Sequence, residues 1–599
     1  MPIHRGILCF GARPGVPVGA WDHVEAGIGM SQGDSQWIDA TDAMPAVSAS
    51  GFVLTWDGRL DNRDDLLLRL GTSDRAVADS HLVLQIIERW GTDGLKWLSG
   101  EWSLAAWNAP RRTLYLARDF FGARPLYYFT NARGVTWSED LAELVERTDR
   151  VDALSDAFAA QFMSLQRAPG ITPYHEVRAL RPGTCVSFTA DGSTASTRLW
   201  SVQVGEIRYR DSHAYEEHLR SLWCDALRTR LRTEGIVWAE LSGGLDSSSV
   251  ACMADWLIRC GRVRASGIRL VSHATLQSPE GDERRFIAEV ERQLGVRSEI
   301  VGVEDSQGCI DPQLSWVSPY ALQGVGLETC RRIREGGGRV VFSGRLGDAV
   351  MGCQPDNSIA VLEDLARGHI LTAFSRMRRW SRATHKPFLE IARNLFAPST
   401  QPAPDTGIGL LTHALRPLAL QSISEDLLDG IRASKRPLAR MVLGYADGAR
   451  LDIPYRPPGL VYTYPFAHRP LVEFMLAIPG EELSEPGITR SLMRRAFAGF
   501  VPARILRRES KGYYPPAAFR AARHAIAAMP PVTDLEVVKR GWIDPASLQA
   551  AIRTLTDGSG ATGGDIHCVL RLEHWLRARS LRASIPRRKE VNEHAVLNA

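Results

Sequence analysis

The chain has 599 residues, which is more than one hydrophobic core usually serves, so two or more domains are expected. Its apolar content of 44% and charged content of 23% are typical of a globular protein, and a formal charge of +4 does not favour nucleic acid as a partner. No run of about 18 apolar residues predicts a membrane span, and the N-terminus lacks the apolar stretch of a signal peptide.

Short strand patterns separated by turns fill the first 205 residues. Half-buried antiparallel strands are predicted where apolar side chains alternate with polar ones. These patterns lie in 51-GFVLTWDGRLDN-62, 101-EWSLAAWNAPRRTLYLARD-119, 125-PLYYFT-130 and 184-TCVSF-188. Two stretches, 80–90 and 140–147, have the spacing of helices.

From about residue 206 the pattern changes to long helical segments that alternate with short apolar runs at 237–241, 269–273 and 339–343. This alternation predicts a parallel sheet in an α/β domain. The stretch 397-APSTQPAPDTGIG-409 is expected to be a surface loop, and the polar tail after Pro586 to be disordered. The nine cysteines are dispersed and form no CxxC pair, which disfavours a zinc ribbon and a disulfide framework and favours a cytoplasmic location.

The stretch 241-LSGGLDSSSV-250 connects an apolar run to a helical pattern. Its two glycines let backbone amides turn inward, and the helix start adds unpaired N–H groups, so the loop can cradle an anion. It lacks the GK[ST] ending of a Walker loop and matches SGGxDS, the pyrophosphate loop of enzymes that cleave ATP to AMP and pyrophosphate. A phosphate would repel Asp246, so this carboxylate suits a Mg²⁺ bridge. The alternative is a helix N-cap after a glycine turn.

A second glycine-rich turn follows another apolar run, in 339-RVVFSGRLGDAVMGC-353, and contains one acid, Asp348. Ligands of open α/β sheets bind beyond the carboxyl ends of the strands, so the two turns are expected to hold one Mg²⁺–nucleotide. Downstream, 502-PARILRRESKGYYPP-516 gathers Arg507, Arg508 and Lys511, cations that suit negative charge on an α-phosphate and on a tetrahedral oxyanion. Alone, these motifs also fit a plain strand-to-helix turn and a solvated basic loop.

SGGLDSS, SGRLGDAVMG and RRESKGYYPP, in that order, resemble the synthetase domain of the asparagine synthetase B superfamily, as does 463-TYPFAHRPLVEFMLAIP-479. The first half resembles the class II glutaminase domain of the same family, through 57-DGRLDNRDDL-66, 112-RTLYLARDFFGARPLYY-128, 137-WSEDLAEL-144 and 181-RPGTCVSF-188. The resemblance implies an α+β, Ntn-type antiparallel sandwich at residues 1–205. It implies an α/β PP-loop ATP pyrophosphatase domain, an ATP-dependent amide ligase, at residues 206–599.

The resemblance also implies roles for individual residues, with ATP and Mg²⁺ as the cofactors. Lys511, Asp246 and Asp348 would be the catalytic residues, and the two carboxylates would bind Mg²⁺. The pyrophosphate loop and the AMP pocket would be formed by Leu241, Ser242, Gly243, Gly244, Leu245, Asp246, Ser247, Ser343 and Gly344.

The N-terminus departs from the family pattern. Class II glutaminases use an N-terminal cysteine that is freed when the initiator Met is removed, and its own α-amine serves as the base. This chain begins Met1-Pro2-Ile3, and Cys9 is internal. Glutamine hydrolysis is therefore expected to be lost, so the first half would be an inactive glutaminase-like domain.

The second turn departs from the pattern as well. Ala349 replaces the acid that follows the metal-binding aspartate, and Arg345 stands where the family usually has Glu or Tyr. The acid that usually precedes the PFLD-like segment has no obvious counterpart, because 445-YADGARLDIPY-455 offers only Asp447 and Asp452. The general base for the attacking amine is left open.

Family members with an inactive glutaminase half use an amine already present on the substrate. β-Lactam synthetases act on small amino acids. In lasso peptide cyclases an Asp or Glu side chain of a peptide is adenylated and attacked by the peptide's own N-terminal amine. The lasso branch is favoured because the chain is longer than a β-lactam synthetase, with its additional residues between Gly352 and Arg440. There 376-RMRRWSR-382 and the loop 397–409 would help to enclose a folded peptide. A solvated helix face is the alternative for 376–382.

A lasso peptide cyclase would take a precursor or core peptide as substrate, with a leader-binding protein and a leader protease as pathway partners. An asparagine synthetase and a catalytically inactive scaffold are the alternatives from other classes. The missing cysteine after Met1 counts against glutamine-dependent asparagine synthesis, and intact Asp246, Asp348 and Lys511 count against a scaffold. The stretch 569-VLRLEHWLRA-578 is an amphipathic helix pattern that is expected to serve packing.

Overall fold

The computed structural model describes residues 4–10, 21–25, 28–32, 44–165, 170–202, 205–275, 281–303, 315–320, 324–354, 356–396, 407–419, 428–447, 459–509, 522–557 and 563–583. The expected loop 397–409, apart from its last three residues, and the tail after Pro586 lie outside them. Among these residues, no helix has the length and apolar character needed to cross a bilayer. The eight cysteines that fall within them are free thiols.

Two six-stranded sheets form the first half, with the strand orders β10-β8-β9-β1-β3-β2 and β12-β11-β7-β6-β5-β4. The strands predicted at 51–62, 101–119, 125–130 and 184–188 are confirmed as β5, β6 with β7, β8 and β11. The bounds are β1 (His4–Cys9), β2 (His23–Glu25), β3 (Ile28–Gln32), β4 (Ala46–Val47), β5 (Phe52–Leu60), β6 (Gly100–Asn108), β7 (Thr113–Arg118), β8 (Tyr127–Asn131), β9 (Gly134–Ser138), β10 (Val177–Ala179), β11 (Thr184–Thr189), β12 (Thr194–Arg198), α1 (Arg63–Leu70), α2 (Asp79–Trp90) and α3 (Leu141–Arg147).

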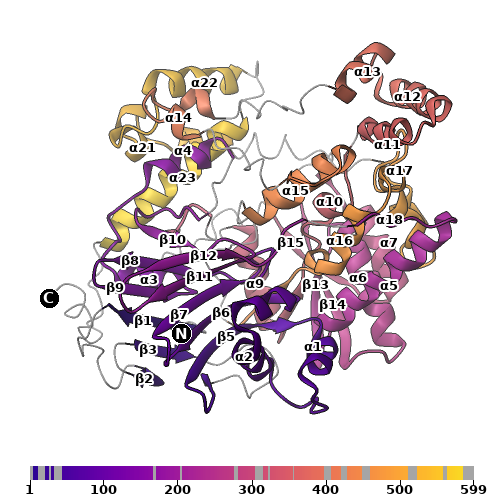
Figure 1. Cartoon of the computed structure of the whole chain (residues 1–599). Helices are drawn as coiled ribbons and strands as arrows, with labels where there is room; N and C mark the ends of the chain where they lie inside the picture. Colours follow the sequence, from indigo (N-terminus) through magenta and orange to yellow (C-terminus); the bar gives the residue numbers. More distant parts are fainter. Residues whose placement is uncertain are drawn as a thin grey trace.

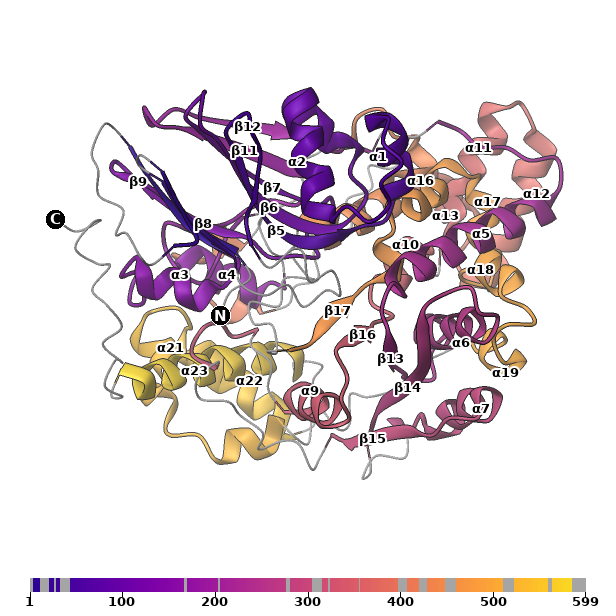
Figure 2. The ribbon, with the colours of Figure 1, turned by 90° about the horizontal axis from the view of Figure 1, so that it is seen from below.

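The two sheets stack face to face between helices. Successive residues of a strand point to opposite faces, so β5 serves two cores. Val53 packs between the sheets with Leu8 and Trp107, whereas its neighbour Leu54 packs against α1 and α2. Helix α3 covers the outer face of the other sheet through Leu144. The result is a helix–sheet–sheet–helix sandwich, which Figure 2 shows edge-on, and it confirms the expected α+β antiparallel fold.

A five-stranded parallel sheet in the order β15-β14-β13-β16-β17 forms the centre of the second half. The apolar runs predicted at 237–241, 269–273 and 339–343 are confirmed as β13, β14 and β16. Helices α5, α6, α7 and α16 pack on one face, and α9 covers the other. The bounds are β13 (Gly235–Glu240), β14 (Ala265–Ala274), β15 (Ser298–Gly302), β16 (Val340–Phe342), β17 (Val461–Thr463), α5 (Ser212–Arg230), α6 (Leu245–Arg259), α7 (Arg284–Leu294), α9 (Val325–Glu335) and α16 (Arg469–Ala477).

The remaining helices of the described chain range from single helical turns to the 21-residue α23. Their bounds are η2 (Gly91–Trp97), α4 (Asp156–Met163), α10 (Gly347–Val350), η4 (Ser358–Ala360), α11 (Val361–Ala366), α12 (Ile370–Thr384), α13 (Phe388–Phe396), η5 (Ile408–Leu410), α14 (Arg416–Ala419), η7 (Ala433–Lys435), α15 (Arg436–Asp447), η8 (Pro465–Ala467), α17 (Gly480–Leu483), α18 (Ser491–Ala496), α19 (Ala503–Leu506), η9 (Val532–Asp534), α21 (Glu536–Lys539), α22 (Pro545–Asp557) and α23 (Gly563–Ala583).

Helix α4 of the first half packs into a core made by the C-terminal helices, at the upper left of Figure 1. Phe158 and Phe162 of α4 share an apolar cluster with Trp542 and Trp575. Trp542 Nε1 also donates to Asp156 Oδ1 at 2.7 Å. Trp575 is fully buried, so the amphipathic stretch predicted at 569–578 serves packing within α23. The two halves share this core, and the domain boundary at 205/206 stays a prediction.

Helices α11, α12 and α13 form a helical unit with a small core of its own, at the upper right of Figure 1. The basic-aromatic stretch 376–382 lies on α12. Trp380 is buried in that core, and Arg376 Nη1 lies 2.7 Å from carboxylate oxygens of both Asp364 and Glu481. These two residues of the stretch are therefore structural, whereas Arg378 is exposed.

Candidate functional site

The SGGLDSS loop joins β13 to the start of α6, at the carboxyl edge of the parallel sheet. Gly243 has a φ of +69°, which favours glycine, and a Cβ at this position would lie 2.7 Å from Cβ of Phe286. Ser247 Oγ accepts from Ser242 N at 3.1 Å and lies 3.0 Å from Ser242 Oγ. Gly244 is the N-cap, and no described side chain caps α6. The amides that begin this 15-residue helix are therefore available to an anion.

The second glycine-rich turn, between β16 and α10, lies against this loop. Ser343 Oγ donates to Glu240 Oε2 at 2.6 Å, which fixes the start of the turn to the end of β13. A Cβ on Gly344 would lie 2.8 Å from Ser247 N, and one on Gly347 would lie 2.5 Å from Cγ of Asp246. Glycine at both positions lets the two turns touch. The residues predicted for the pyrophosphate loop and the AMP pocket thus lie together, and their ligands stay a prediction.

Arg490 joins the two carboxylates that were predicted to bind metal. Its Nη1 donates to Oδ1 and Oδ2 of Asp246 and to Oδ1 of Asp348, each at 2.8 Å. The side chain of Arg490 is 8% exposed, and the residue has a φ of +55° just before α18. Sequence reasoning missed Arg490 because it lies outside the three motifs, 142 residues from Asp348.

Two carboxylates that converge on one cation are a donor set that suits Mg²⁺, which prefers oxygen ligands and completes its shell with phosphate oxygens and water. Where the chain is described, no group of three or more His, Cys, Asp or Glu side chains could hold a metal by itself. A metal at Asp246 and Asp348 would therefore need further ligands from a bound nucleotide and from water.

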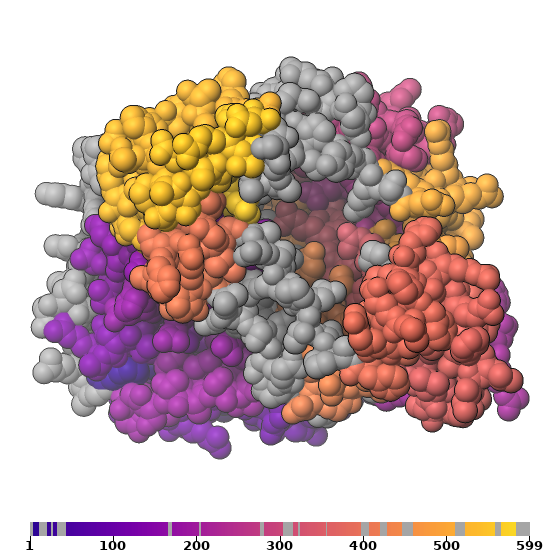
Figure 3. Space-filling model, turned by 90° about the horizontal axis from the view of Figure 1, so that it is seen from above, coloured from indigo at the N-terminus to yellow at the C-terminus, as the bar shows by residue number. Residues whose placement is uncertain are grey.

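Two cavities meet at the carboxylate pair, and both are lined by Gly244 and Asp348. The first, of about 1180 Å³, is rich in arginine, with Arg490, Arg494, Arg495, Arg507 and Arg508 in its wall. The second, of about 890 Å³, has a mixed wall that includes Glu240, Leu241, Ser242, His273, Ser343, Arg345, Tyr445 and Arg571. Figure 3 shows the molecule hollowed between the C-terminal helices and the unit of α11, α12 and α13.

The third motif reaches the first cavity. Arg508 is bound to the loop, because its Nη1 donates to Gly243 O at 3.0 Å and its Nη2 donates to Glu283 Oε1 at 2.5 Å. Arg507 is exposed and lines the same cavity. Lys511, the predicted catalytic lysine, lies outside the described residues. Its role stays a prediction.

The candidates for a general base stay open. Asp447 is the last residue of α15, and Asp452 lies outside the described residues. Arg345, at the position where the family pattern has Glu or Tyr, is exposed in the wall of the second cavity.

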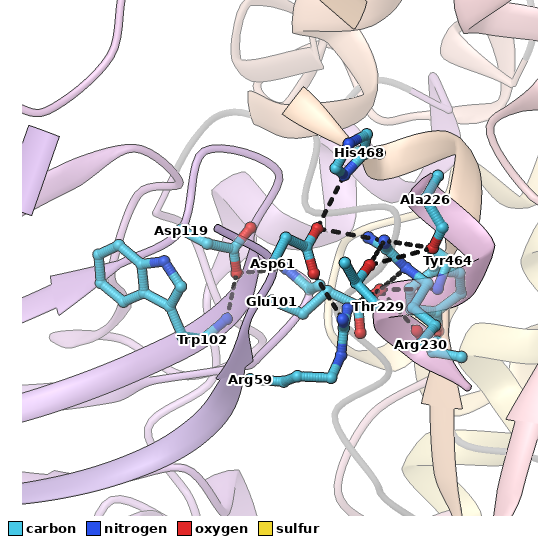
Figure 4. Close-up of polar contacts among 12 residues, drawn as sticks. Arg59, Asp61, Glu101, Trp102, Asp119, Ala226, Thr229, Arg230, Tyr464 and His468 are labelled. Atoms are coloured by element: carbon cyan, nitrogen blue, oxygen red, sulfur yellow. Dashed lines mark hydrogen bonds and ion pairs between the residues drawn. The ribbon is translucent and has the colours of Figure 1, made fainter. Parts of the chain in front are cut away.

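A buried charged network crosses the interface between the two halves, as Figure 4 shows. Glu101 of β6 accepts four hydrogen bonds, three from residues of the second half and one from the first half. Its Oε1 accepts from Thr463 Oγ1 at 2.9 Å, Tyr464 N at 2.8 Å and Arg230 Nε at 3.2 Å, and its Oε2 accepts from Arg124 Nη2 at 3.1 Å. The first half thus holds the end of β17 in place.

Asp61 is the second carboxylate of this network. Its Oδ2 accepts from Arg230 Nη1 at 3.2 Å and lies 2.9 Å from Nδ1 of His468, and its Oδ1 lies 2.5 Å from Arg59 Nη1. Burial alone would raise the pKa of Asp61, but Arg230 and Arg59 outweigh it and hold that pKa well below its ordinary value. The carboxylate therefore stays ionised, and it keeps the interface network charged.

Comparison with known proteins agrees with the two folds. The glutamine amidotransferase domain matches residues 22–200. The chain is similar to the glutamine-hydrolyzing asparagine synthetase 3 of Bacillus subtilis (strain 168), with 28% identity over 214 residues that make up 34% of each protein. It is also similar to a putative glutamine-hydrolyzing asparagine synthetase of Mycobacterium tuberculosis (strain ATCC 25618 / H37Rv), with 28% identity over 221 residues, 35% of this chain and 34% of that one.

A third relative is Amidase chry2 of Gibberella zeae, with 24% identity over 240 residues, 38% of this chain and 35% of that one. The matches thus span about a third of the length of these relatives. Among solved structures, a glutamine phosphoribosylpyrophosphate amidotransferase from B. subtilis has a TM-score of 0.23 at 15% identity, over 57% of this chain and 75% of that one. The asparagine synthase model matches residues 218–577, more than half of the sequence, and the chain therefore belongs to the asparagine synthase family.

Proposed function

We propose that this chain is an ATP-dependent amide ligase that adenylates an Asp or Glu side chain of a core peptide and joins it to the N-terminal amine of that peptide. This is the reaction of a lasso peptide cyclase, which forms a macrolactam and releases AMP and pyrophosphate. A leader-binding protein and a leader protease would be its pathway partners. The observation that supports the proposal best is that the SGGLDSS loop, the Asp348 turn and Arg508 converge on two adjoining cavities.

In the first step, a carboxylate oxygen of the peptide would attack the α-phosphorus of ATP, and the bond to pyrophosphate would break. The amides at the start of α6 and the hydroxyl of Ser247 would hold the pyrophosphate, with the arginines of the first cavity balancing its charge. Mg²⁺, when bound to Asp246 and Asp348, screens the negative charge of the phosphates. In the second step, the amine nitrogen would attack the acyl carbon, the bond to AMP would break, and the amine would lose a proton.

The glutaminase-like half is proposed to be inactive. The first cysteine of the sequence is Cys9. Cys9, the last residue of β1, is buried, and burial raises the pKa of its thiol. A thiol that stays protonated is a poor nucleophile. The nitrogen of the new amide would therefore come from an amine on the substrate.

Asparagine synthesis is a second candidate, because curated relatives of this chain are named asparagine synthetases. Free ammonia would then take the place of the peptide amine, and aspartate the place of the peptide carboxylate. Both candidates release AMP and pyrophosphate, so nucleotide products alone do not separate them.

The nature of the acylated product separates the two candidates. Purified full-length protein is incubated with ATP and Mg²⁺, in one arm with synthetic peptides that have a free N-terminal amine and one Asp or Glu, and in the other with aspartate and ammonium. Mass loss of one water from a peptide, with AMP formed in equal amount, is the expected result. Asparagine in the second arm, without a change in any peptide, would instead assign the protein to asparagine synthesis. Asp246→Asn is the inactive control.

A further inference from the structure

One arginine of the second cavity is exposed, and its side chain has no partner among the described residues. Arg345 lies in the turn between Ser343 and Asp348, and it lines the cavity beside the SGGLDSS loop. Its guanidinium makes no hydrogen bond or ion pair with any described residue. Arginine has five N–H donors in a fixed fork that matches a carboxylate or a phosphate. A guanidinium in a cavity wall that is not used by a described side chain therefore has the donors to bind an anion.

Glu240 lies near Arg345 without forming an ion pair with it among the described residues. Enclosure by the cavity wall would lower the pKa of Arg345, but Tyr464, Glu240 and Tyr462 outweigh it and raise that pKa; arginine is charged at neutral pH in either case. Glu240, the one acid among these three, is engaged elsewhere, because its Oε2 accepts from Ser343 Oγ at 2.6 Å.

We propose that Arg345 binds the carboxylate that the ligase activates, so the part of the second cavity at Arg345 is the subsite for the acidic side chain of the substrate, beside the residues predicted to bind the nucleotide. This inference rests on the proposed function, and it names the residue that selects an acid. A carboxylate must approach the α-phosphate against the repulsion of two negative charges, and a cation one residue beyond Gly344 offsets that repulsion where it arises.

Phosphate is the other anion that Arg345 could bind, and the distribution of arginines argues against it. The first cavity has five arginines in its wall, which suits pyrophosphate, whereas the second has two, Arg345 and Arg571; the start of α6 borders both cavities. The wall of the second cavity also includes His273, Tyr445 and Glu240, a mixture of charge that suits one carboxylate better than a polyphosphate.

Binding can be measured without turnover. The probe is N-acetyl-L-aspartate amide, whose only charge is the side-chain carboxylate, with N-acetyl-L-asparagine amide as the neutral counterpart. Saturation-transfer NMR on the full chain measures the affinity of each for the parent protein, Arg345→Met, Arg345→Glu and the control Arg378→Met. Arg378 is an exposed arginine on α12, outside both cavity walls. AMP is titrated in parallel, and near-UV circular dichroism checks the fold of each variant.

The expected result is that the parent and Arg378→Met bind the aspartate probe but not its asparagine counterpart. Arg345→Met should bind that probe about tenfold to hundredfold more weakly, the factor for loss of a charge-assisted hydrogen bond, with AMP affinity unchanged. Arg345→Glu should bind N-acetyl-L-lysine amide instead. Equal binding of the aspartate probe by Arg345→Met and the parent, no binding by the parent, or loss of AMP in place of the carboxylate would each overturn the inference. The result does not depend on ligation, so the proposed function is judged separately by its products.

Discussion

Replacing Glu101 by glutamine removes one negative charge from the interface network and leaves the shape of the side chain almost unchanged. Glu101 is 1% exposed, so water cannot replace what the substitution removes. The amide oxygen of a glutamine can still accept from Thr463 or Tyr464. It gives neither Arg230 nor Arg124 a charged acceptor, and both arginines are buried as well.

The cost follows from those two bonds. A hydrogen bond to a charged group contributes about 1.5–3 kcal/mol, so losing two costs about 3–6 kcal/mol. Removing one partner of a buried ion pair costs about 3–5 kcal/mol, which agrees with this estimate from the hydrogen bonds. A loss of that size corresponds to roughly 10²- to 10⁴-fold more frequent local opening. Since Glu101 bonds to Thr463 and to Tyr464 N, the opening should appear in the segment that begins at β17.

Hydrogen exchange followed by mass spectrometry measures this opening directly, and it does not need two-state unfolding of a large chain. Peptides that cover 461–468 should exchange about 10²- to 10⁴-fold faster in Glu101→Gln. Glu143→Gln is the matched control, because Glu143 pairs with Arg5 inside the first half and is partly exposed, where such a pair contributes at most about 1 kcal/mol. Equal exchange of 461–468 in the two variants would refute the reasoning.

Acidification gives an independent check on the same carboxylate. Burial raises the pKa of Glu101, but Arg230, Arg59 and Arg124 outweigh it and lower that pKa below its ordinary value. A lowered pKa in the folded state contributes stability that is complete above the unfolded pKa and is lost as pH falls through the folded one. The difference between the parent and Glu101→Gln should stay constant from pH 7 to about 5 and shrink only below about 4.

Four further outcomes are expected. Asp246→Asn or Asp348→Asn should abolish pyrophosphate release with the fold intact, and normal turnover in both would contradict the metal assignment. Arg490→Met should bind Mn²⁺ about tenfold more tightly without nucleotide, measured by electron paramagnetic resonance, because the arginine no longer competes for the two carboxylates; unchanged affinity would count against that competition. Added glutamine should give no glutamate, because Cys9 is buried and burial raises the pKa of its thiol; steady glutamate formation would reveal an active first half. Lys511→Met should lower turnover about 10²- to 10³-fold with ATP affinity by calorimetry little changed, and cyclisation at the parent rate would make Lys511 a surface residue.

The sequence predicted those features of the fold that neighbouring residues determine, namely the longer strands and the glycine-rich turns. The alternation around Val53 and Leu54 specified β5, and the glycines of the two turns marked where backbone segments come into contact. The shorter strands, such as β2 and β4, passed unnoticed, because two or three residues make no periodic pattern. Gly347 shows the limit of such reasoning: its sequence context indicated a turn, but not that Asp246 lies against it.

Contacts between distant residues could not be predicted in this way. Arg490 meets Asp246 across 244 positions, and Glu101 meets Tyr464 across 363. In the sequence, an arginine such as Arg490 cannot be distinguished from one on a solvated surface. Only the tertiary fold brings its acidic partners to it. Arg345 is an intermediate case, because the sequence shows its departure from the family pattern but not that its side chain has no partner among the described residues.

The packing of α4 among the C-terminal helices restricts how this chain can be divided. Ser164, just after α4, donates to Ala419 O at 2.9 Å, and Tyr174 OH donates to Val317 O at 2.9 Å, so segments from both sides of position 205 complete each other's cores. A gene fragment that ends near that position would encode a sandwich with an uncovered aromatic face at Phe158 and Phe162. Deletion of the sandwich would in turn uncover the matching face of the C-terminal helices, so each half is expected to fold and to stay in solution less well without the other.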